Sequence, residues 1–588
     1  MDRAGSSNPG MHGHWDTIVI GSGAGGLTAA VALARAGQRV LVLEQHYLPG
    51  GWCHSFSLGG HRFSPGVHYL GALGPGGDLR RVYEGLGLTR DLSFNELSPK
   101  GFDHFLIAGQ RFDVPRGFER WLARLCERFP HERAGIARYF GVLRAVHREL
   151  LDLRASTLLD KLRLPFRAPH LLRWGLSTQQ ALLDETITDP MLAAVLAAQS
   201  GNHGLAPSRV SLPLHASMIA HYEGGAYYPR GGAKRIPLAM IKALRAKGGS
   251  IRLRARVRRI LVEKDRAIGV ELEGGERIGA RDVVSNADPA VTFGKLLEPP
   301  HGEKERRKVA RSEYSVSTLS LFATVEMDLR ARGFDSGNYW FYRHDDVGAL
   351  YERLERRLLT REVDGLFLAV SSLKDATGER AEHAKKGDLH TIEMFTFVPH
   401  APFARWEGKA QGERGADYED LKESLGEAML AAAEEVIPGL RKALRFHAVG
   451  TPLTNGFYCE TPFGASYGTA KTPRQLGPFS FSIESSVRHL YSVGASTISH
   501  GVAGASMSGL SAAATIVGAK STEELLGPAD GSLEIHKIVG EASGDAREAS
   551  AGADDRSAER RHGPAERGDR PPESGHRPAE SGDRSAIR

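Results

Sequence analysis

Two apolar runs, separated by a glycine turn and an alanine-rich stretch, open the patterned part of the chain. Residues 18–20 (Ile-Val-Ile) are uninterruptedly apolar, as in a parallel strand that is buried on both faces. Glycines crowd residues 21–26, and the stretch from about Ala24 to Ala36 predicts a helix. A second apolar run ends at Glu44. The pattern therefore predicts a strand, a tight turn, a helix and a second strand, in that order.

Period-two alternation marks another group of strands farther along the chain. Residues 251–257 alternate apolar and polar side chains, and residues 267–272 and 277–284 supply two further strand-like runs. We expect them to form a small antiparallel unit, preceded by an amphipathic helix that ends near residue 248. Residues 116–200 carry apolar side chains at three- and four-residue spacing, which predicts mostly helices.

The C-terminal stretch has no such pattern. From Glu541 onward, Ile587 is the only aliphatic residue larger than alanine, and the near-repeat over 572–584 is of low complexity. A segment of this composition cannot bury enough apolar area to offset the entropy lost on ordering. We therefore predict that residues 527–588 are a disordered tail without chemistry of their own.

Composition narrows the class of protein. With 588 residues, 41% hydrophobic and 25% charged, the chain has room for about two to four modules of a soluble globular protein. The net charge of +6 is spread along the chain, and residues 541–588 hold nine Lys/Arg against eleven Asp/Glu. This modest excess predicts a solvated surface, with anionic lipid a better second interpretation than nucleic acid.

Cysteine usage and the lack of long apolar runs bear on location. Cys53, Cys126 and Cys459 lie far apart, which argues against a disulfide framework or a metal site and fits a reducing compartment. Residues 1–14 lack the apolar core of a signal peptide, and no run is long enough for a transmembrane helix. We expect a cytoplasmic protein, with membrane association as an open alternative.

That alternative concerns residues 153–174, where leucines alternate with five basic residues and a tryptophan. A basic amphipathic stretch of this kind can lie in a membrane interface as a peripheral, monotopic anchor. The other interpretation is a surface helix pair, broken at Pro165 and Pro169, that packs on its own domain.

The glycine turn has the chemistry of a dinucleotide site. Gly21 permits the tight turn, Gly23 leaves room for a pyrophosphate, and Gly26 lets the helix pack closely on the strand. The helix N-terminus, beginning with Ala24 and Gly25, directs its N–H groups at the phosphates. Glu44 follows Gly26 by eighteen residues, where a carboxylate accepts hydrogen bonds from ribose hydroxyls and disfavours a 2′-phosphate. FAD or NAD is therefore expected rather than NADP.

Further motifs in a fixed order resemble a known flavoprotein family. The set resembles the phytoene desaturase, carotenoid isomerase and retinol saturase family of FAD-dependent, amine-oxidase-like proteins. The resemblance runs from about Asp16 to Gly518. Its motifs are Pro49-Gly-Gly51, 63–71 (Phe-Ser-Pro-Gly-Val-His-Tyr-Leu-Gly), 228–232 (Tyr-Pro-Arg-Gly-Gly), 283–289 (Val-Val-Ser-Asn-Ala-Asp-Pro), 490–496 and 501–506.

Three segments lean toward the retinol saturase branch: 50–56 (Gly-Gly-Trp-Cys-His-Ser-Phe), 66–71, and 451–458 taken with 464–468. The resemblance implies hydride transfer at a carbon–carbon double bond of a long, apolar isoprenoid, with NAD(P)H as an external reductant. Saturation is preferred, then desaturation, then cis–trans isomerisation. The motifs do not choose among them, and they carry no signal for oligomeric state.

The resemblance also implies an α/β fold with a Rossmann-like FAD-binding domain of the GR2 type and an interleaved α+β substrate domain. The FAD domain would comprise 14–90, 225–295 and 480–522, and the substrate domain 91–224 and 296–479. Its implied cofactor-binding residues, besides those of the glycine turn and Glu44, are Gly50, Gly51, Val257, Ala287, Asp288, Gly494, Gly501 and Val502. The last two would open a helix whose N-terminus stabilises charge on the flavin.

His68 and Tyr69, placed near the flavin ring by the resemblance, are the candidates for proton donation to carbon. The alternative is that they pack beneath the flavin and do not titrate. His500 carries the same ambiguity, and a thiolate–imidazole pair of Cys53 with His54 is disfavoured because neighbours on a strand point to opposite faces. Two rival functions remain: a non-enzymatic prenyl-lipid escort of the Rab GDP-dissociation-inhibitor type, and an oxidase of a soluble amine.

Overall fold

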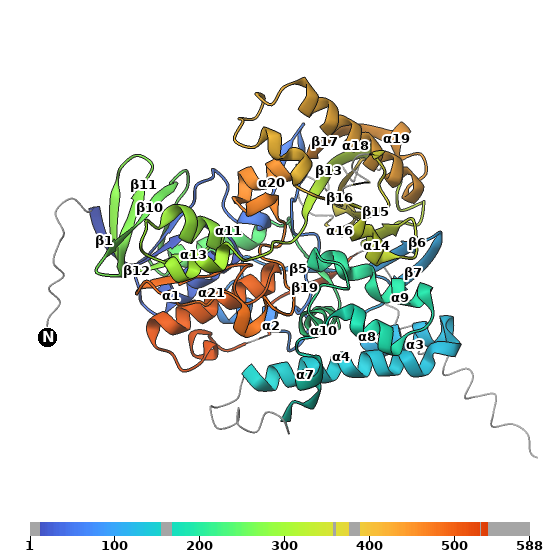
Figure 1. The fold of residues 1–588 in the computed structure, drawn as a ribbon, viewed down its shortest axis with the longest axis horizontal. Helices are drawn as coiled ribbons and strands as arrows, with labels where there is room; N and C mark the ends of the chain where they lie inside the picture. Colours follow the sequence, from blue (N-terminus) through green and yellow to red (C-terminus); the bar gives the residue numbers. More distant parts are fainter. Residues whose placement is uncertain are drawn as a thin grey trace, which may run out of the picture. The chain divides into compact units, whose positions relative to one another are not determined.

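The computed structural model describes residues 12–154, 167–354, 356, 360–375, 389–529 and 531–538. These residues build two seven-stranded sheets, two smaller sheets and the helices that cover them (Figure 1). The α/β class expected from the sequence is confirmed. Among the described residues, no helix is both long enough and apolar enough to cross a membrane.

The first large sheet has the N-terminal strand at its centre. β1 (His12–Ile20) pairs in parallel with β2 (Val40–Leu43) on one side and with β12 (Arg277–Ser285) on the other. The strand order is β10-β11-β12-β1-β2-β9, and β18 pairs in parallel with β12. The other strands are β9 (Ser250–Arg252), β10 (Val257–Glu263), β11 (Arg266–Leu272) and β18 (Leu490–Ser492).

Helices with small residues cover this sheet. α1 (Ala24–Arg35) confirms the predicted helix after the glycine turn, and it packs against α11 (Arg235–Ala246) and α21 (Gly501–Val517). The contact with α21 is close, because a Cβ atom on Gly509 would lie 2.1 Å from the carbonyl oxygen of Gly25. This close approach brings the last helix of the described chain to the glycine turn near its start.

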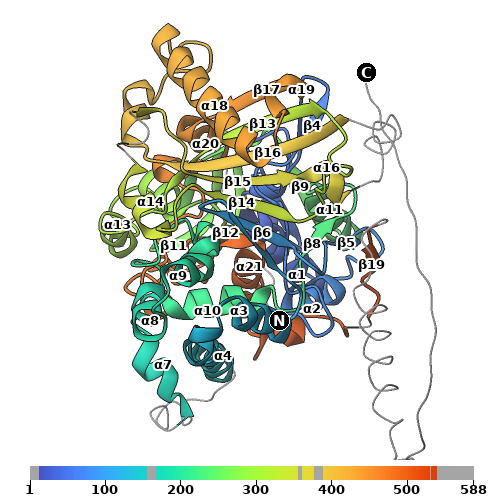
Figure 2. The same cartoon turned by 90° about the vertical axis from the view of Figure 1, so that its right-hand side faces the viewer.

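The second large sheet is mostly antiparallel, in the order β17-β13-β16-β15-β14-β6-β7 (Figure 2). The helix α18 (Ala416–Val436) packs on one face, whereas Trp340, Tyr342 and Phe367 on the other face belong to a core shared with helices that lie between residues 118 and 221. The strands are β6 (Asp103–Ile107), β7 (Gln110–Val114), β13 (Ser317–Glu326), β14 (Asn338–Tyr342), β15 (Gly365–Val370), β16 (Leu389–Val398) and β17 (Leu444–Gly450).

The remaining elements are short sheets and helices. The helices within 116–200 confirm the helical pattern expected there for the described residues: α3 (Phe118–Arg128), α4 (Arg133–Arg154), α7 (Pro169–Trp174), α8 (Gln179–Thr186) and α9 (Pro190–Ala197). Others include α2 (Asp78–Gly85), α10 (Leu212–His221), α13 (Glu303–Val309), α14 (Val347–Glu352), α16 (Ser371–Lys374), α19 (Leu440–Ala443) and α20 (Pro452–Cys459). The small strands are β3 (Phe56–Leu58), β4 (His61–Phe63), β5 (Phe94–Glu96), β8 (Tyr227–Pro229) and β19 (Ile535–Lys537).

Two expectations about boundaries were wrong. The alternating run 251–257 is not one strand: β9 ends at Arg252, Arg254 has φ +55°, and β10 begins only at Val257. β9 pairs in parallel with β2, so it belongs to the main sheet. The alternation did not reveal the turn, because polar residues suit an exposed loop as well as the solvent-facing positions of a strand.

The tail does not begin at residue 527. β19 pairs in parallel with β5, and Leu533 is 2% exposed. Composition predicted disorder for the whole stretch, but a few apolar side chains suffice when an existing strand edge supplies backbone partners. The part of the tail beyond residue 538 lies outside the described residues, as does most of 153–174.

Each large sheet draws its strands from separate parts of the chain. The first sheet uses residues 12–43, 250–285 and 490–492, and the second uses 103–114, 317–398 and 444–450. Apart from His12 and Gly13, these sets fall within the segments expected for the FAD domain and the substrate domain, respectively. The division into two domains by function stays a prediction.

Candidate functional site

A cavity of about 1260 Å³ runs from the glycine turn of the first sheet to the inner face of the second. It is lined by Gly21, Gly23 and Glu44 at one end and by Trp340 and Phe367 at the other. Pockets for single drug-sized ligands are typically about 300–1,000 Å³. The cavity therefore has room for a large cofactor together with a second molecule.

The glycine turn forms a cradle that side chains would fill. Gly21 has φ +89°, a left-handed conformation that glycine adopts without strain. A Cβ atom on Gly25 would lie 2.9 Å from the Ala505 carbonyl oxygen, and one on Gly26 would lie 2.3 Å from the Gly21 carbonyl oxygen. Gly23, Ala24 and Gly25, at the N-terminus of α1, line the cavity, which fits the pyrophosphate of a dinucleotide.

Sequence reasoning missed Asn286, although it lies within a motif quoted for the family. Its Oδ1 accepts a hydrogen bond from the Gly26 N–H at 3.0 Å, and it follows directly after β12. A Cβ atom on Gly23 would lie 2.6 Å from its Nδ2. Asn286 therefore links the end of β12 to the glycine turn that follows β1. Its one available signal was its place just beyond a buried strand.

We expect replacement of Asn286 by alanine to lower both thermal stability and FAD retention. Without the amide oxygen, the part-buried N–H of Gly26 has no acceptor, at a cost of about 1–3 kcal/mol. The matched variant Asn286→Asp keeps an oxygen acceptor but adds a negative charge beside the predicted diphosphate. It should keep the melting temperature better than it keeps FAD, as measured by differential scanning fluorimetry and flavin absorbance. Equal losses in both variants would contradict this role.

Glu44 stands where the sequence placed it, one residue after β2. Its side chain is 6% exposed, and its Oε2 accepts hydrogen bonds from the N–H and Oγ of Ser22, at 2.9 and 2.5 Å. The other oxygen accepts from the N–H of His46 at 2.9 Å. A carboxylate has about four acceptor positions, so Glu44 can bind ribose hydroxyls while it holds the turn.

The cofactor residues implied by the resemblance gather around the same cavity. Asp288 is half-buried, its carboxylate accepts from the hydroxyls of Tyr314 at 2.7 Å and Ser496 at 2.9 Å, and desolvation raises its pKa. Gly501 begins α21. Of the predicted residues, Gly26 is absent from the lining and packs against β1. The lining includes Gly21, Gly23, Ala24, Gly25, Glu44, Gly50, Gly51, Val257, Ala287, Asp288, Gly494, Gly501 and Val502.

His68 lines the cavity, and within the described part of the chain neither of its ring nitrogens meets a partner at hydrogen-bonding geometry. Its ring lies 4.6 Å from that of Phe395 and 5.6 Å from that of Phe367, measured between centroids. Burial, together with the charge of Lys374, holds its pKa well below the usual range, so the ring is neutral at pH 7. A buried, unpartnered polar ring of this kind is a candidate contact for a ligand.

Tyr69, by contrast, has polar partners on both sides. Its hydroxyl donates to Asp103 at 3.3 Å and accepts from the Asn202 amide at 2.8 Å, and its ring stacks on Tyr222 at 4.6 Å. Burial raises its pKa well above the usual value. The two candidate proton donors therefore share the cavity but differ in surroundings: His68 faces apolar rings, and Tyr69 joins a polar network.

The Cys53–His54 pair carries no thiolate chemistry, although not for the reason expected. Gly51–Cys53 is a turn of 3₁₀ helix rather than a strand. Cys53 is 4% exposed, and burial raises its pKa to about 12. At pH 7 its sulfur is a thiol, which is neither a nucleophile nor a metal ligand. His500 also lines the cavity, but its Nε2 is bonded to the Asn202 carbonyl at 2.8 Å.

Comparison with known proteins gives a consistent result. The family model for flavin containing amine oxidoreductases matches residues 24–345. All-trans-retinol 13,14-reductase of Macaca fascicularis is 31% identical over 518 residues, 83% of each chain. Prolycopene isomerase of Daucus carota is 28% identical over 494 residues, 82% of this chain and 76% of that one. The crystal structure of an oxidoreductase from Methanosarcina mazei shares the fold, with a TM-score of 0.55 at 19% identity over 84% of this chain and 99% of that one.

Proposed function

This chain belongs to the family of flavin-containing amine oxidoreductases, and from that premise we propose that it reduces a carbon–carbon double bond of a long, apolar isoprenoid of the retinoid or carotenoid kind. The protein is an FAD-dependent oxidoreductase. The observation that carries the substrate class is the continuity of the dinucleotide cradle with an aromatic wall on the second sheet. Relatives named for retinol and prolycopene support it.

FAD, when bound, would supply the hydride chemistry of the reaction. The chain's own residues would hold it by backbone N–H groups at the glycine turn and at the N-terminus of α21, where the helix dipole favours negative charge. The remaining proposed contacts are Glu44 at the adenosine ribose, Val257, Ala287 and Asp288 on the adenosine side, and Gly50, Gly51 and Gly494 along the phosphates.

The substrate end of the cavity has an aromatic wall. The side chains of Trp340, Phe367 and Phe395 line it, and they would exclude water and align a polyene with the cofactor. His68 and Tyr69 are the proposed donors of a proton to the carbon beside the one that receives the hydride. A soluble amine would find few partners on this wall, which disfavours the amine-oxidase alternative.

The test is anaerobic incubation of the FAD-loaded protein with all-trans-retinol, phytoene and prolycopene. The flavin should first be reduced by dithionite or NAD(P)H, and a parallel sample should stay oxidised. A product two mass units heavier supports saturation, a lighter one desaturation, and an unchanged mass with altered retention time isomerisation. A colourless protein that binds no added FAD supports the lipid-escort alternative. Absence of any reaction and any change in the flavin spectrum would overturn the isoprenoid assignment.

We also propose that the protein binds membranes through the surface at α4 and α7. Leu172, in the described end of the predicted membrane stretch, is 67% exposed. Leu176, just after that stretch, is 69% exposed. Leu151, 40% exposed on α4, lines the cavity as well as the surface. An apolar substrate could therefore pass from a bilayer into the cavity without crossing water.

A double replacement of Leu172 and Leu176 by glutamate should abolish sedimentation with vesicles. Two apolar side chains lost from the interface remove about 0.8 kcal/mol for each buried CH₂, and the new charges add repulsion from anionic lipid. The measurement uses vesicles of phosphatidylcholine and phosphatidylserine. Leu238→Glu is the matched control, since Leu238 is 44% exposed on α11. Unchanged binding of the double variant would rule out this surface.

A further inference from the structure

A closed chain of buried polar contacts surrounds the peptide that joins His68 to Tyr69. The ammonium group of Lys374 donates to the His68 carbonyl at 2.7 Å and to the Oδ1 of Asn338. Asn338 donates from Nδ2 to Asp103 at 2.9 Å, and Tyr69 donates to the other oxygen of Asp103 at 3.3 Å. The series of contacts thus begins at the carbonyl of His68 and ends at the hydroxyl of the next residue, Tyr69.

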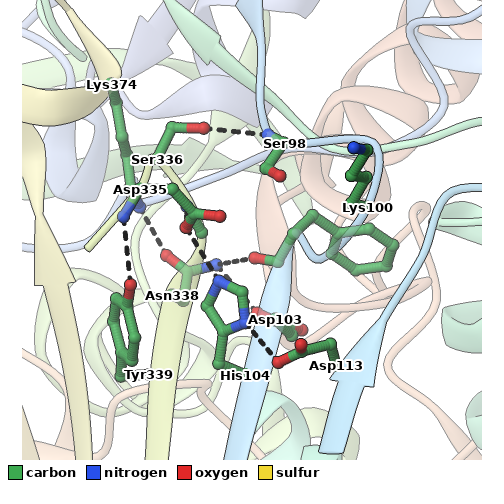
Figure 3. A network of polar contacts seen from close by, with 12 residues as sticks. Ser98, Lys100, Asp103, His104, Asp113, Asp335, Ser336, Asn338, Tyr339 and Lys374 are labelled. Carbon is green, nitrogen blue, oxygen red and sulfur yellow. Dashed lines mark hydrogen bonds and ion pairs between the residues drawn. The ribbon is translucent and has the colours of Figure 1, made fainter. Parts of the chain in front are cut away.

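Long-range pairing assembles this network from four separate segments. Asp103 begins β6 and Asn338 begins β14, and these parallel strands place the two residues opposite each other. Lys374 ends α16, close to both strands (Figure 3). All three side chains have no solvent exposure. Burying a carboxyl and an ammonium group is costly and seldom adds stability, so the pair calls for a role beyond the fold.

Asp103 is the member that faces the cavity through Tyr69. Its Oδ2 also accepts from Gln199 at 2.7 Å. Burial raises its pKa, and the hydrogen bonds from Asn338 and Gln199, followed by the charge of Lys374, oppose that rise. Burial in turn lowers the pKa of Lys374 to about 7. Six titratable or charged groups of the described residues face these two side chains. His68 and Tyr69 lie before α2, Tyr222 follows α10, Asp335 precedes β14, Tyr342 ends β14, and Glu393 lies on β16.

We propose that Asp103 is the acid that restores the proton of Tyr69 during double-bond reduction, and that Lys374 tunes this acid from across Asn338. The inference rests on the proposed function and deepens it, because saturation consumes a proton at every turnover whereas isomerisation consumes none overall. Tyr69 is the group that touches substrate. Asp103 acts through it, and Lys374 acts through Asp103.

The bonds balance as follows. One carbon of the double bond receives a hydride from the reduced cofactor, while the O–H bond of Tyr69 breaks and its proton forms a C–H bond on the neighbouring carbon. In the acid form the contact between the two groups is reversed, so that the O–H of Asp103 donates to the Tyr69 oxygen. This O–H bond breaks as that of Tyr69 forms again, which leaves a carboxylate that accepts from Tyr69 at 3.3 Å and lies near the Lys374 ammonium. The double bond is reduced and the flavin is oxidised. A two-electron donor of the NAD(P)H class and a proton from water complete the cycle.

Infrared spectroscopy of the FAD-loaded protein tests the acid without any substrate. A carboxylic acid C=O band should disappear as pH rises through the raised pKa of Asp103, and Asp103→Asn should remove it. Lys374→Met removes the charge that lowers this pKa, so the band should persist to higher pH. Asp113→Asn is the matched control. Asp113 bonds His104, and because His104 follows Asp103 directly on β6, the side chains of these two residues point to opposite faces of the sheet. A band that survives Asp103→Asn, or a titration midpoint of the band that Lys374→Met does not shift, overturns the proposal.

Turnover supplies the second measurement. The rate should fall as pH rises through the same pKa, and Asp103→Asn should lower it by about 10²-fold or more and abolish that limb. Lys374→Met should shift the limb to higher pH with normal FAD content, and Asp113→Asn should leave it in place. If the wild-type protein reduces no polyene, the proposed function fails and the infrared titration still decides whether Asp103 is this acid. If the wild-type protein reduces a polyene and Asp103→Asn shows the same pH dependence of turnover, the proposed role of Asp103 is wrong and the proposed function stands.

Discussion

Replacing Gly26 by alanine is expected to yield a protein that has largely lost FAD. The new methyl group would lie 2.3 Å from the Gly21 carbonyl oxygen and 3.2 Å from Cγ1 of Val19, so α1 must move away from β1. Overpacking of this kind costs about 1–3 kcal/mol, and each 1.4 kcal/mol is a tenfold change in affinity. FAD affinity should thus fall by about ten- to a hundredfold, as measured by equilibrium titration of the apoprotein.

Gly141→Ala is the matched control. Gly141 lies on α4, and a Cβ atom there would meet no atom within 4 Å. Alanine in a helix interior is more stable than glycine by about 0.5–1 kcal/mol, so this variant should gain stability and keep its FAD. Full FAD affinity in Gly26→Ala would show that the turn tolerates a shift of α1 and that the close packing of helix on strand is not needed for the cofactor.

The second large effect is expected from Tyr69→Phe. Phenylalanine keeps the ring that stacks on Tyr222 but removes the hydroxyl between Asp103 and Asn202. Loss of a general acid typically lowers the rate by about 10²–10⁴-fold. The decrease should appear in kcat with little change in KM, because the aromatic wall that binds the substrate is intact. Flavin reduction by the external donor should be unaffected.

Tyr83→Phe controls for the loss of a buried hydroxyl as such. Tyr83 is fully buried, and its hydroxyl has no hydrogen-bond partner among the described residues. Its replacement should leave turnover unchanged and leave stability equal or higher. An unchanged kcat in Tyr69→Phe would exclude Tyr69 as the proton donor.

The local parts of the cofactor site were predictable because their signals lie within short stretches. The apolar run before Gly21, the helix after it and the acid at Glu44 are consecutive in the chain, and the structure has α1 over Ala24–Arg35 with Glu44 beside the turn. The alternation over 251–257 was less reliable, since β9 and β10 divide it. A periodic pattern reports which faces are buried, but it does not report where the chain turns.

The polar groups behind the site left no such signal. Asn286 bonds Gly26 across 260 residues, and Asp103, Asn338 and Lys374 meet only because β6 pairs with β14 and α16 follows β15. Nothing in the neighbourhood of Lys374 in the sequence distinguishes it from a surface lysine. Its burial, and hence its pKa of about 7, is a property of the packed interior.

The glycine turn, the dinucleotide chemistry and the order of the motifs could be predicted from the chain alone, because backbone conformation at Gly21 and the spacing to Glu44 are local requirements. The groups that surround the second half of the cavity are set by the packing of distant segments. This packing brings His68 against Phe395, links Tyr69 to Asp103 and places Lys374 behind them. The physical reason is that desolvation and hydrogen bonding between distant segments set the protonation of these groups, and both arise only once the sheets have formed.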